Sequence, residues 1–467
     1  PLMCSEFWSG WFDKWGARHE TRPAADMVDG IDQMLQRGIS FSLYMTHGGT
    51  SFGHWAGANS PGFAPDVTSY DYDAPIGEAG QSTEKYWLLR NTLQKHTADK
   101  LPAVPKAPMG VISVPKISFT RANTLQELVD TTLFSRDVLT FEDLDMGWGT
   151  AIYSKVMPSV PEGSMLTVNE PHDYVQAYVN GTLVGVIDRT RNEHTLALPV
   201  INRGDTLSLV VEAMGRINFG RAIKDYKGIT DRVTVTYSDD GNEVVVDLKD
   251  WTISTIPDGY DHIMGKPFVT ALPQDGPGLY VGKFNLKKVG DTFLNLQHWG
   301  KGQLYDNGHA LGRFWGIGPQ QTLYVPGCWL EKGENEVVIY DVVGPKQAIA
   351  WGQDKPELDM LQLPKSAKHN DPGNRPDLNS RTPALVVTPA AAGWQSFRLD
   401  VPATGRFLAI EVPDGDKVAV AEVYALGSDG KRLPRENWKA HYATSELLAG
   451  NHTLDKAFDL QETTHWL

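Results

Sequence analysis

The stretch YVQAYVNGTLVGVIDR (174–189) decides the fold of most of the chain. Runs of β-branched and aromatic residues flank an Asn-Gly pair at 180–181, and such a pair between two such runs is the strongest short-range sign of a two-residue β-hairpin turn. The stretch LYDNGHALGRFWG (304–316) repeats this plan around an Asn-Gly pair at 307–308. We therefore predict two antiparallel hairpins, one in each of two related β domains.

The similarity continues beyond the hairpins. Each is followed by a Gly-polar turn and an apolar strand, RGDTLSLVVEAMG (203–215) and KGENEVVIYDVVG (332–344). Short strands separated by Gly, Pro, Asn and Asp extend from about residue 105 to 350, which is typical of an all-β region. We predict two β-sandwiches of the jelly-roll type, the first over residues 101–235 and the second over 236–352.

Residues 1–100 have a different character, with strands and helices in alternation. An apolar run ends in Glu6, a helix with one apolar face is predicted over 23–37, a strand over 39–45 and a second helix over 82–96. This order indicates a parallel sheet covered by helices. Two such units cannot close a sheet, so we expect the segment to be the C-terminal portion of a larger α/β domain.

The composition limits the class of protein. Hydrophobic residues are 41% of the 467 residues and charged residues 21%, and no run of about 18 apolar residues suggests a membrane span. The net charge of -14 disfavours an extended nucleic-acid surface, because phosphate binding needs clustered Lys and Arg. Cys4 and Cys328 are interpreted as free thiols, and the sequence shows no metal-site spacing and predicts no cofactor.

Aromatic residues point toward carbohydrate. The chain has 14 tryptophans, and aromatic faces pack against the C–H faces of sugars. For any single tryptophan, a place in the core is the alternative. In parallel (β/α) barrels the reactive groups lie at the C-terminal ends of strands, where Glu6 and Tyr44 are expected. Glycoside hydrolysis needs two carboxyl groups, and Glu6 could supply one, although a structural acid paired with Arg or Lys fits the same residue.

Four motifs together resemble the end of the catalytic barrel of family 35 glycoside hydrolases, the β-galactosidases: SEFWSGWFDKWG, SLYMTHGGTSFGHWAGAN, TSYDYDAPIGEAG and TEKYWLLRNTLQ. They occur in the family's order and spacing. The resemblance implies that residues 1–100 are the C-terminal portion of a TIM (β/α)8 barrel, followed by jelly-roll domains of which the second is galactose-binding-like. It also implies a retaining exo-acting enzyme that removes terminal non-reducing β-D-galactose from oligosaccharides or glycans.

The resemblance also assigns roles to Glu6 and Tyr72, and we add Tyr44, on the strand next to Glu6, and Trp11 to the same site. Glu6 takes the place of the catalytic nucleophile, which forms a glycosyl-enzyme ester that water then hydrolyses. Tyr72, the second tyrosine of the Tyr-Asp-Tyr motif, is the residue expected to contact galactose. Tyr44 is expected to donate a hydrogen bond to Glu6 and keep it ionised. Trp11 is placed in the substrate pocket, where a wall of the barrel would use the same residue.

One element of the family pattern is missing. The family's acid/base glutamate lies in an Asn-Glu motif before the nucleophile, and the Asn-Glu pairs of this chain all fall within the β region without that context. We therefore expect the chain to be part of a longer enzyme and to be inactive alone. A non-catalytic carbohydrate-binding or scaffold role, and a β-glucosaminidase activity of the same barrel, stay open as alternatives.

For the C-terminal part of the chain, from residue 353 on, the sequence predicts domain boundaries but no catalytic or binding residue. Residues 353–385 are polar and proline-rich and are interpreted as a linker. Residues 386–430 and 431–467 resemble the end of one discoidin-type (factor 5/8 C-like) module and the start of another. From these features we expect a secreted or periplasmic bacterial protein. The sequence makes no prediction of oligomeric state.

Overall fold

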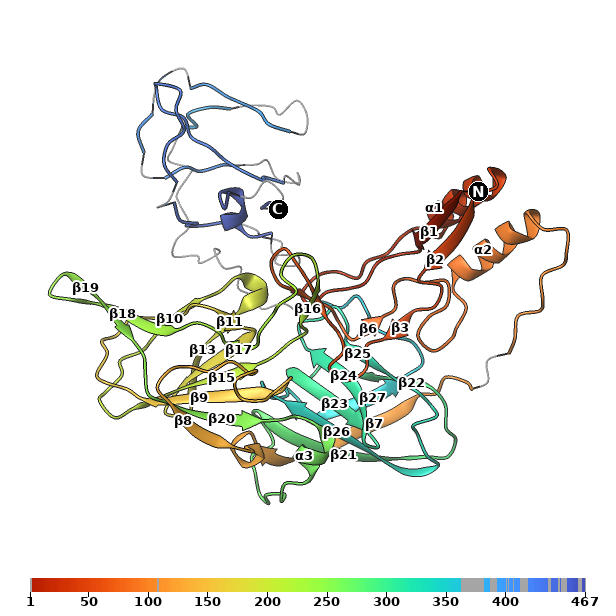
Figure 1. Cartoon of the computed structure of the whole chain (residues 1–467), viewed down its shortest axis with the longest axis horizontal. Helices are drawn as coiled ribbons and strands as arrows, with labels where there is room; N and C mark the ends of the chain where they lie inside the picture. Colours follow the sequence, from red (N-terminus) through yellow and green to blue (C-terminus); the bar gives the residue numbers. More distant parts are fainter. Residues whose placement is uncertain are drawn as a thin grey trace. The chain divides into compact units, whose positions relative to one another are not determined.

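The computed structural model divides into two compact units, Pro1–Gln362 and Leu363–Leu467 (Figure 1). In the first unit it describes residues 2–106 and 109–362. In the second it describes 382–386, 393–399, 401, 403–405, 407–411, 419–435, 438–443, 446, 452–460 and 464–466. No helix in these described segments is long and apolar enough to cross a membrane.

The N-terminal segment contains a two-stranded parallel sheet, β1 (Met3–Trp8) and β2 (Ser40–Tyr44), with helices α1 (Ala24–Gln36) and α2 (Glu84–Lys95). These are the predicted strands and helices, with ends that differ by one or two residues. Helix α1 buries Met27, Val28 and Ile31 in one cluster with Leu89 of α2. The apolar spacing seen in the sequence is thus the face through which the two helices pack together.

Short strands connect this segment to the β-rich part. They are β3 (Gly49–Thr50), β4 (Ala58–Asn59), β5 (Ala64–Pro65) and β6 (Ser69–Tyr70). Strand β4 pairs in parallel with β16 (Ile217–Phe219), which comes from the first β region. A Cβ at Gly215 would lie 2.1 Å from the carbonyl oxygen of Gly57. Glycine at this position therefore allows the two backbones to approach.

The first β region contains two larger sheets. The six-stranded sheet has the order β13-β12-β15-β9-β20-β8 and the four-stranded sheet the order β14-β10-β18-β19. One hydrophobic core, which includes Tyr153 and Trp251, contains residues from both sheets. Their strands are β8 (Thr132–Ser135), β9 (Thr150–Val156), β10 (Met165–Val168), β12 (Tyr174–Val179), β13 (Thr182–Asp188), β14 (Thr195–Ala197), β15 (Thr206–Glu212), β18 (Val233–Asp239), β19 (Asn242–Asp247) and β20 (Trp251–Ile256).

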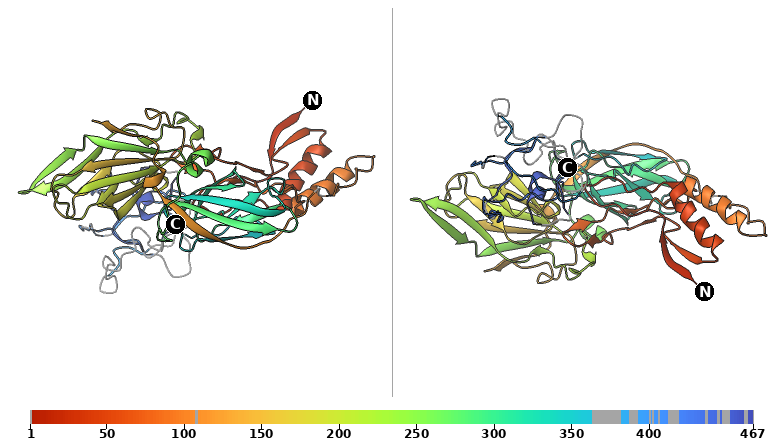
Figure 2. Two further views of the ribbon diagram at one scale, coloured as in Figure 1. Left: turned by 90° about the horizontal axis from the view of Figure 1, so that it is seen from below. Right: turned by 90° about the horizontal axis from the view of Figure 1, so that it is seen from above.

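The second β region is an eight-stranded sheet of order β24-β23-β26-β21-β7-β27-β22-β25 around a core that includes Trp299. Figure 2 shows β7, coloured orange, among the green and cyan strands of this sheet. Its strands are β7 (Val114–Thr124), β21 (Gly278–Leu286), β22 (Thr292–Asn295), β23 (Lys301–Asp306), β24 (His309–Trp315), β25 (Thr322–Val325), β26 (Gly333–Asp341) and β27 (Ile349–Gln353). The remaining small elements are η1 (Gln126–Leu128), β11 (Pro171–His172), η2 (Arg189–Arg191), β17 (Gly228–Ile229), α3 (Tyr260–Met264) and η4 (Leu454–Ala457).

Both predicted hairpins are confirmed, β12–β13 and β23–β24. Asn180 and Asn307 both have the positive φ that a tight hairpin turn needs, and a glycine with positive φ follows each of them. Each asparagine side chain also accepts a 2.9 Å hydrogen bond from a backbone N–H, that of Thr206 in β15 and that of Glu336 in β26 respectively. These two strands pair with the first strand of their hairpin, so the two regions share a three-stranded arrangement, β13-β12-β15 and β24-β23-β26.

The sheets differ from the division expected at residues 235/236. Strands β18 to β20 reach residue 256 and belong to the first region's sheets, whereas β7, at 114–124, pairs with β21 and β27 of the second sheet. Strand patterning reveals where strands lie but not which distant strands pair. For this reason the sequence placed β7 with its neighbours along the chain.

The first part of the segment expected to be a linker, residues 353–385, is packed against the second β region. Residues 357–362 run along 317–321, with backbone hydrogen bonds such as that from the Gln321 N–H to the Glu357 carbonyl. Residues 363–381 of the expected linker lie outside the described residues. The discoidin-like segments lie partly outside them as well, and their described residues include backbone bridges Val420–Trp466 and Leu426–Arg432.

Candidate active site

Glu6 lies in β1, the strand that pairs in parallel with β2. Its side chain is exposed, and its Oε2 accepts a 2.8 Å hydrogen bond from the indole Nε1 of Trp8. The main-chain carbonyl of Trp8 in turn accepts a hydrogen bond from the guanidinium of Arg22. The carboxylate is therefore accessible to solvent and is oriented by a neighbour that is itself anchored.

Six aromatic rings in contact with one another form what we call the aromatic wall, which reaches Glu6 through Trp8. Trp11 lies 5.0 Å from Trp8 and 6.1 Å from Tyr72, and Tyr44 lies 5.5 Å from Tyr72, between ring centroids. Tyr72 is only 2% exposed, and burial raises the pKa of its hydroxyl well above the usual value. Its hydroxyl therefore stays protonated and can donate a hydrogen bond. The wall comprises Trp8, Trp11, Phe12, Tyr44, Tyr70 and Tyr72.

A buried lysine on α2 holds the two loops of the wall together. Lys85 Nζ donates hydrogen bonds to the carbonyl of Ser9 at 2.8 Å and to that of Asp73 at 2.7 Å, and it forms an ion pair with the Asp73 carboxylate. Burial lowers the pKa of Lys85 despite this pairing. Since Ser9 follows β1 and Asp73 follows Tyr72, this clamp fixes the position of Tyr72 relative to Glu6.

Glu78 is a second carboxyl near the wall, but it is buried. It accepts a 2.7 Å hydrogen bond from the Thr50 hydroxyl on β3, and burial raises its pKa to about 8. The neighbouring Asp71 also has a raised pKa because of burial. At neutral pH Glu78 therefore retains its proton and is a neutral hydrogen-bonding group.

Replacement of Glu78 by glutamine is expected to make stability less dependent on pH. A carboxyl whose pKa is raised from the usual 4.5 to about 8 in the folded chain binds more protons there than in the unfolded chain, so its contribution falls as pH rises across that window. Glu78→Gln keeps an oxygen to accept from Thr50 and cannot ionise. Urea unfolding should show the variant to be more stable at pH 9 and nearly unchanged at pH 5, and an equal pH dependence would contradict the proposed burial effect.

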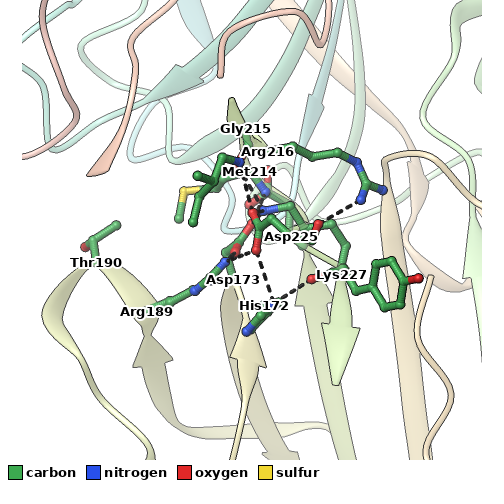
Figure 3. Close-up of polar contacts among 12 residues, drawn as sticks. His172, Asp173, Arg189, Thr190, Met214, Gly215, Arg216, Asp225 and Lys227 are labelled. Carbon is green, nitrogen blue, oxygen red and sulfur yellow. Dashed lines mark hydrogen bonds and ion pairs between the residues drawn. The ribbon is translucent and has the colours of Figure 1, made fainter. Parts of the chain in front are cut away.

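A buried charge network lies in the first β region (Figure 3). Lys227 Nζ contacts Asp173 at 2.6 Å and Asp225 at 2.8 Å, and Arg189 Nη1 contacts the same two carboxylates at 2.6 and 2.8 Å. Lys227 and Asp173 have no exposed side-chain surface. Two acids and two bases balance in charge, which is the condition under which ionised groups can be buried.

This buried charge network fixes the segment 214–217. Asp173 accepts a 2.7 Å hydrogen bond from the Met214 N–H, and Lys227 donates one of 2.9 Å to the Gly215 carbonyl. The segment continues into β16, which pairs with β4 of the N-terminal segment. The guanidinium of Arg189 also lies 4.2 Å from the centre of the Phe63 ring. The network therefore supports the contact between the first β region and the loop that leads to Tyr72.

The structure brings the four residues selected from the sequence into one neighbourhood. Trp11, Tyr44 and Tyr72 belong to the aromatic wall, and the charge of Glu6 acts on Tyr72. The partner expected for Glu6 differs. The Tyr44 hydroxyl lies 3.2 Å from that of Tyr70, and Trp8 donates to Glu6 instead.

Sequence reasoning missed Lys85, Glu78 and the buried charge network. Lys85 stands among charged residues at the start of a helix, where a surface position is the ordinary interpretation. Lys227 lies in a polar stretch, DYKG, that is typical of a turn. Nothing local marks either lysine as buried. Asp225 lies only two residues before Lys227, but an acid at that spacing is equally common at the surface, and the other partners, Asp173 and Asp73, lie further away in sequence.

Three family models match the chain. Residues 1–96 match "Glycosyl hydrolases family 35", 138–255 match "Beta-galactosidase, first all-beta domain" and 277–335 match "Beta-galactosidase, galactose-binding domain". The matches define the class of each segment. Residues 1–96 are a glycosyl hydrolase family 35 domain, and the β regions that follow contain the first all-beta and galactose-binding domains described for β-galactosidases.

Curated relatives agree with the family. Human "Beta-galactosidase-1-like protein 3" is 34% identical over 77% of this chain and 55% of its own length. Bovine "Beta-galactosidase" is 33% identical over 79% of this chain and 60% of its own length. The chain thus spans little more than half the length of these relatives. An α-L-rhamnosidase structure from Streptomyces avermitilis covers 50% of this chain and 27% of its own, at 13% identity, with a TM-score of 0.20, too low to indicate a shared fold.

The expected localisation is wrong. The sequence led us to expect a secreted or periplasmic bacterial protein, whereas the curated relatives that match include eukaryotic proteins from human, cow and macaque. The expectation rested on sugar-binding modules of bacterial glycosidases, and such a resemblance carries no physical information about the compartment.

Proposed function

We propose that this chain provides the nucleophile of a retaining exo-β-galactosidase, which removes terminal non-reducing β-D-galactose from oligosaccharides or glycans. The observation that carries the proposal is the position of Glu6, a solvent-accessible carboxylate on a parallel strand beside the aromatic wall. The family 35 match of residues 1–96 and the similarity to β-galactosidases support it. Aromatic faces suit the C–H surface of a galactose ring.

The proposed reaction is a double displacement. A Glu6 carboxylate oxygen bonds to the anomeric carbon while the bond to the aglycone oxygen breaks, and that oxygen takes a proton from a general acid. Water then attacks the same carbon, gives up a proton, and Glu6 leaves as a carboxylate. The sum is a β-galactoside plus water giving galactose plus an alcohol. The acid/base carboxyl is not assigned to any residue of this chain.

The aromatic wall and the clamp have separate parts in this proposal. Tyr72 donates a hydrogen bond to a galactose hydroxyl, Trp11 packs against the ring, and Tyr44 borders the pocket beside Tyr70. Trp8 orients the nucleophile. Lys85 touches none of the reacting atoms and acts as a positioning residue for the Tyr72 loop.

The domain architecture is proposed on the same basis. We propose that residues 1–100 belong to a TIM (β/α)8 barrel, which the parallel pairing of β1 with β2 and the two accompanying helices support. The β regions are proposed to be jelly rolls, with β7 reassigned to the second of them. Residues 386–467 are proposed to contain discoidin-like sequence.

A non-catalytic role in carbohydrate binding is the second candidate. The observation that favours it is the match of residues 277–335 to a model described as a galactose-binding domain. In that case the chain would bind a β-galactoside without turnover, and Glu6 would have no covalent role.

Covalent labelling separates the two candidates. A 2-deoxy-2-fluoro-β-galactoside with a good leaving group should form a stable ester with the nucleophile, because the fluorine slows hydrolysis of the intermediate. With the protein as its gene encodes it, we expect the label on the peptide that contains Glu6, located by mass spectrometry. A label on another carboxylate would refute the assignment of Glu6, and an unlabelled protein would favour the binding role.

A further inference from the structure

Two exposed tryptophans from separate parts of the chain lie together outside the aromatic wall. Trp55 is 80% exposed and Trp148 is 43% exposed, and their ring centroids are 6.4 Å apart at an interplanar angle of 60°. Trp55 comes from the loop after β3, and Trp148 from the loop before β9. Two large aromatic side chains that lie side by side and are both exposed to water are characteristic of binding sites.

Trp148 is held in place before any ligand binds. The imidazole of His54 stacks on it at 4.8 Å and 15°, and His54 Nε2 lies 2.9 Å from Asp258. The backbone before Trp148 is held as well, because Arg216 Nη2 donates a 2.7 Å hydrogen bond to the carbonyl of Gly147 (Figure 3 shows Arg216). A side chain fixed in this way loses little entropy when a ligand binds to it.

A shallow depression of about 560 Å³ adjoins Trp148 through Gly147. Its volume is in the range of small-molecule sites. Its polar lining comprises Glu142, Asp145, Arg216, Lys224, Asp225 and Tyr226. Two of the acids are already neutralised, Glu142 by Arg216 and Asp225 by Lys227. The charges that remain, on Asp145 and Lys224, are of opposite sign, so the lining suits a neutral ligand with many hydroxyl groups better than an anion or a cation.

We propose that Trp55, Trp148 and this depression form a binding site for a neutral oligosaccharide. The tryptophans provide flat apolar faces for sugar rings, and the depression provides alternating donors and acceptors for hydroxyl groups. Pyranose chains combine these two properties, since their C–H faces are apolar and their edges are hydrogen-bonding. The site is assembled from the N-terminal segment and the first β region, so an intact contact between them is required.

The test measures oligosaccharide binding to a variant that cannot hydrolyse the oligosaccharide. Titration calorimetry on Glu6→Gln protein would use β-1,4-linked galactotetraose and, separately, cellotetraose. We expect at least one to bind, and Trp148→Ala or Trp55→Ala to weaken that binding about tenfold, as expected for loss of a central aromatic anchor. Trp87→Ala is the matched control, because Trp87 is 46% exposed and lies on α2. It should bind like the parent.

Three outcomes would overturn the site. These are the absence of binding by both oligosaccharides, unchanged affinity in both tryptophan variants, and a loss that follows Trp11→Ala but not Trp55→Ala, which would place binding at the aromatic wall. Trp55→Ala keeps the test valid should Trp148→Ala fold poorly, because its ring is almost fully in solvent. The choice of galactotetraose rests on the proposed function. Binding of cellotetraose alone would support the site without supporting galactosidase activity.

Discussion

Replacing Glu6 by glutamine should lower kcat for an aryl β-galactoside by about 10⁴-fold or more, a loss of the size seen when a covalent nucleophile is removed from an enzyme. The glutamine amide is nearly isosteric and can still accept a hydrogen bond from Trp8, but it cannot attack the anomeric carbon. Substrate binding is expected to change little by comparison. Steady-state kinetics of the protein as its gene encodes it would measure both kcat and KM.

Another glutamate of the N-terminal segment, Glu20, provides the control for the loss of kcat. Glu20 is exposed, and its backbone N–H, not its side chain, bonds to Asp13. Glu20→Gln should therefore leave kcat unchanged. If Glu6→Gln retained a tenth or more of the activity, Glu6 would not be the nucleophile.

The stereochemistry of rescue makes the test of Glu6 sharper. In Glu6→Ala the vacated space can admit azide, which should displace an activated aglycone in a single step and give the galactosyl azide of inverted, α configuration. Loss of an acid/base residue instead leaves the nucleophile in place, so azide would enter at the second step and give the β product. NMR of the product therefore distinguishes the two roles for the same carboxylate.

The parts of this site that sequence could predict are those determined within short stretches of chain. Glu6 with Trp8, and Tyr70 with Tyr72, are neighbours in single motifs, and the Asn-Gly turns at 180–181 and 307–308 depend on two residues each. Such features need only local backbone preferences and alternation. The predicted helices and hairpins were accordingly found where they were expected.

Contacts between distant residues were not predictable in this way. Strand β7 pairs with β21, which lies more than a hundred residues further on, and Asp173 pairs with Lys227, which lies 54 residues further on. Lys85 of the clamp and Lys227 of the buried charge network both lie in local sequences that are equally typical of a surface lysine. Their burial follows from the tertiary fold, which brings Asp73 to Lys85 and Asp173 to Lys227.

The buried charge network leads to the second large prediction. Lys227→Met should lower the free energy of unfolding by about 3–5 kcal/mol, the usual cost of breaking a buried ion pair by removing one partner. Methionine nearly fills the volume of the lysine stem, so the loss is mainly electrostatic. Asp173 and Asp225 would be left buried with Arg189 as their cation. Urea unfolding followed by circular dichroism measures the difference.

The acid side of the stability curve should move as well. Burial alone would raise the pKa of Asp225, but Lys227 and Arg189 outweigh it, so the pKa in the folded chain lies below the usual value of 3.8. A carboxyl whose pKa is lower in the folded chain than in the unfolded chain stabilises the fold at pH values above its unfolded-state pKa. This stabilisation is lost as the pH falls through its folded-state pKa. Without Lys227 this lowering shrinks, and we expect Lys227→Met to unfold at a higher pH than the parent during acid titration.

An exposed lysine gives the comparison that interprets both results. Lys249 pairs with Asp137 and Asp247 at the surface, where solvent screens the attraction, so Lys249→Met should change neither the urea midpoint nor the acid midpoint appreciably. Equal effects of the two substitutions would mean that burial does not strengthen the Lys227 pairs. A large effect confined to Lys227→Met, with weakened contact between β16 and β4, would instead establish the network as the support of the loop that leads to Tyr72.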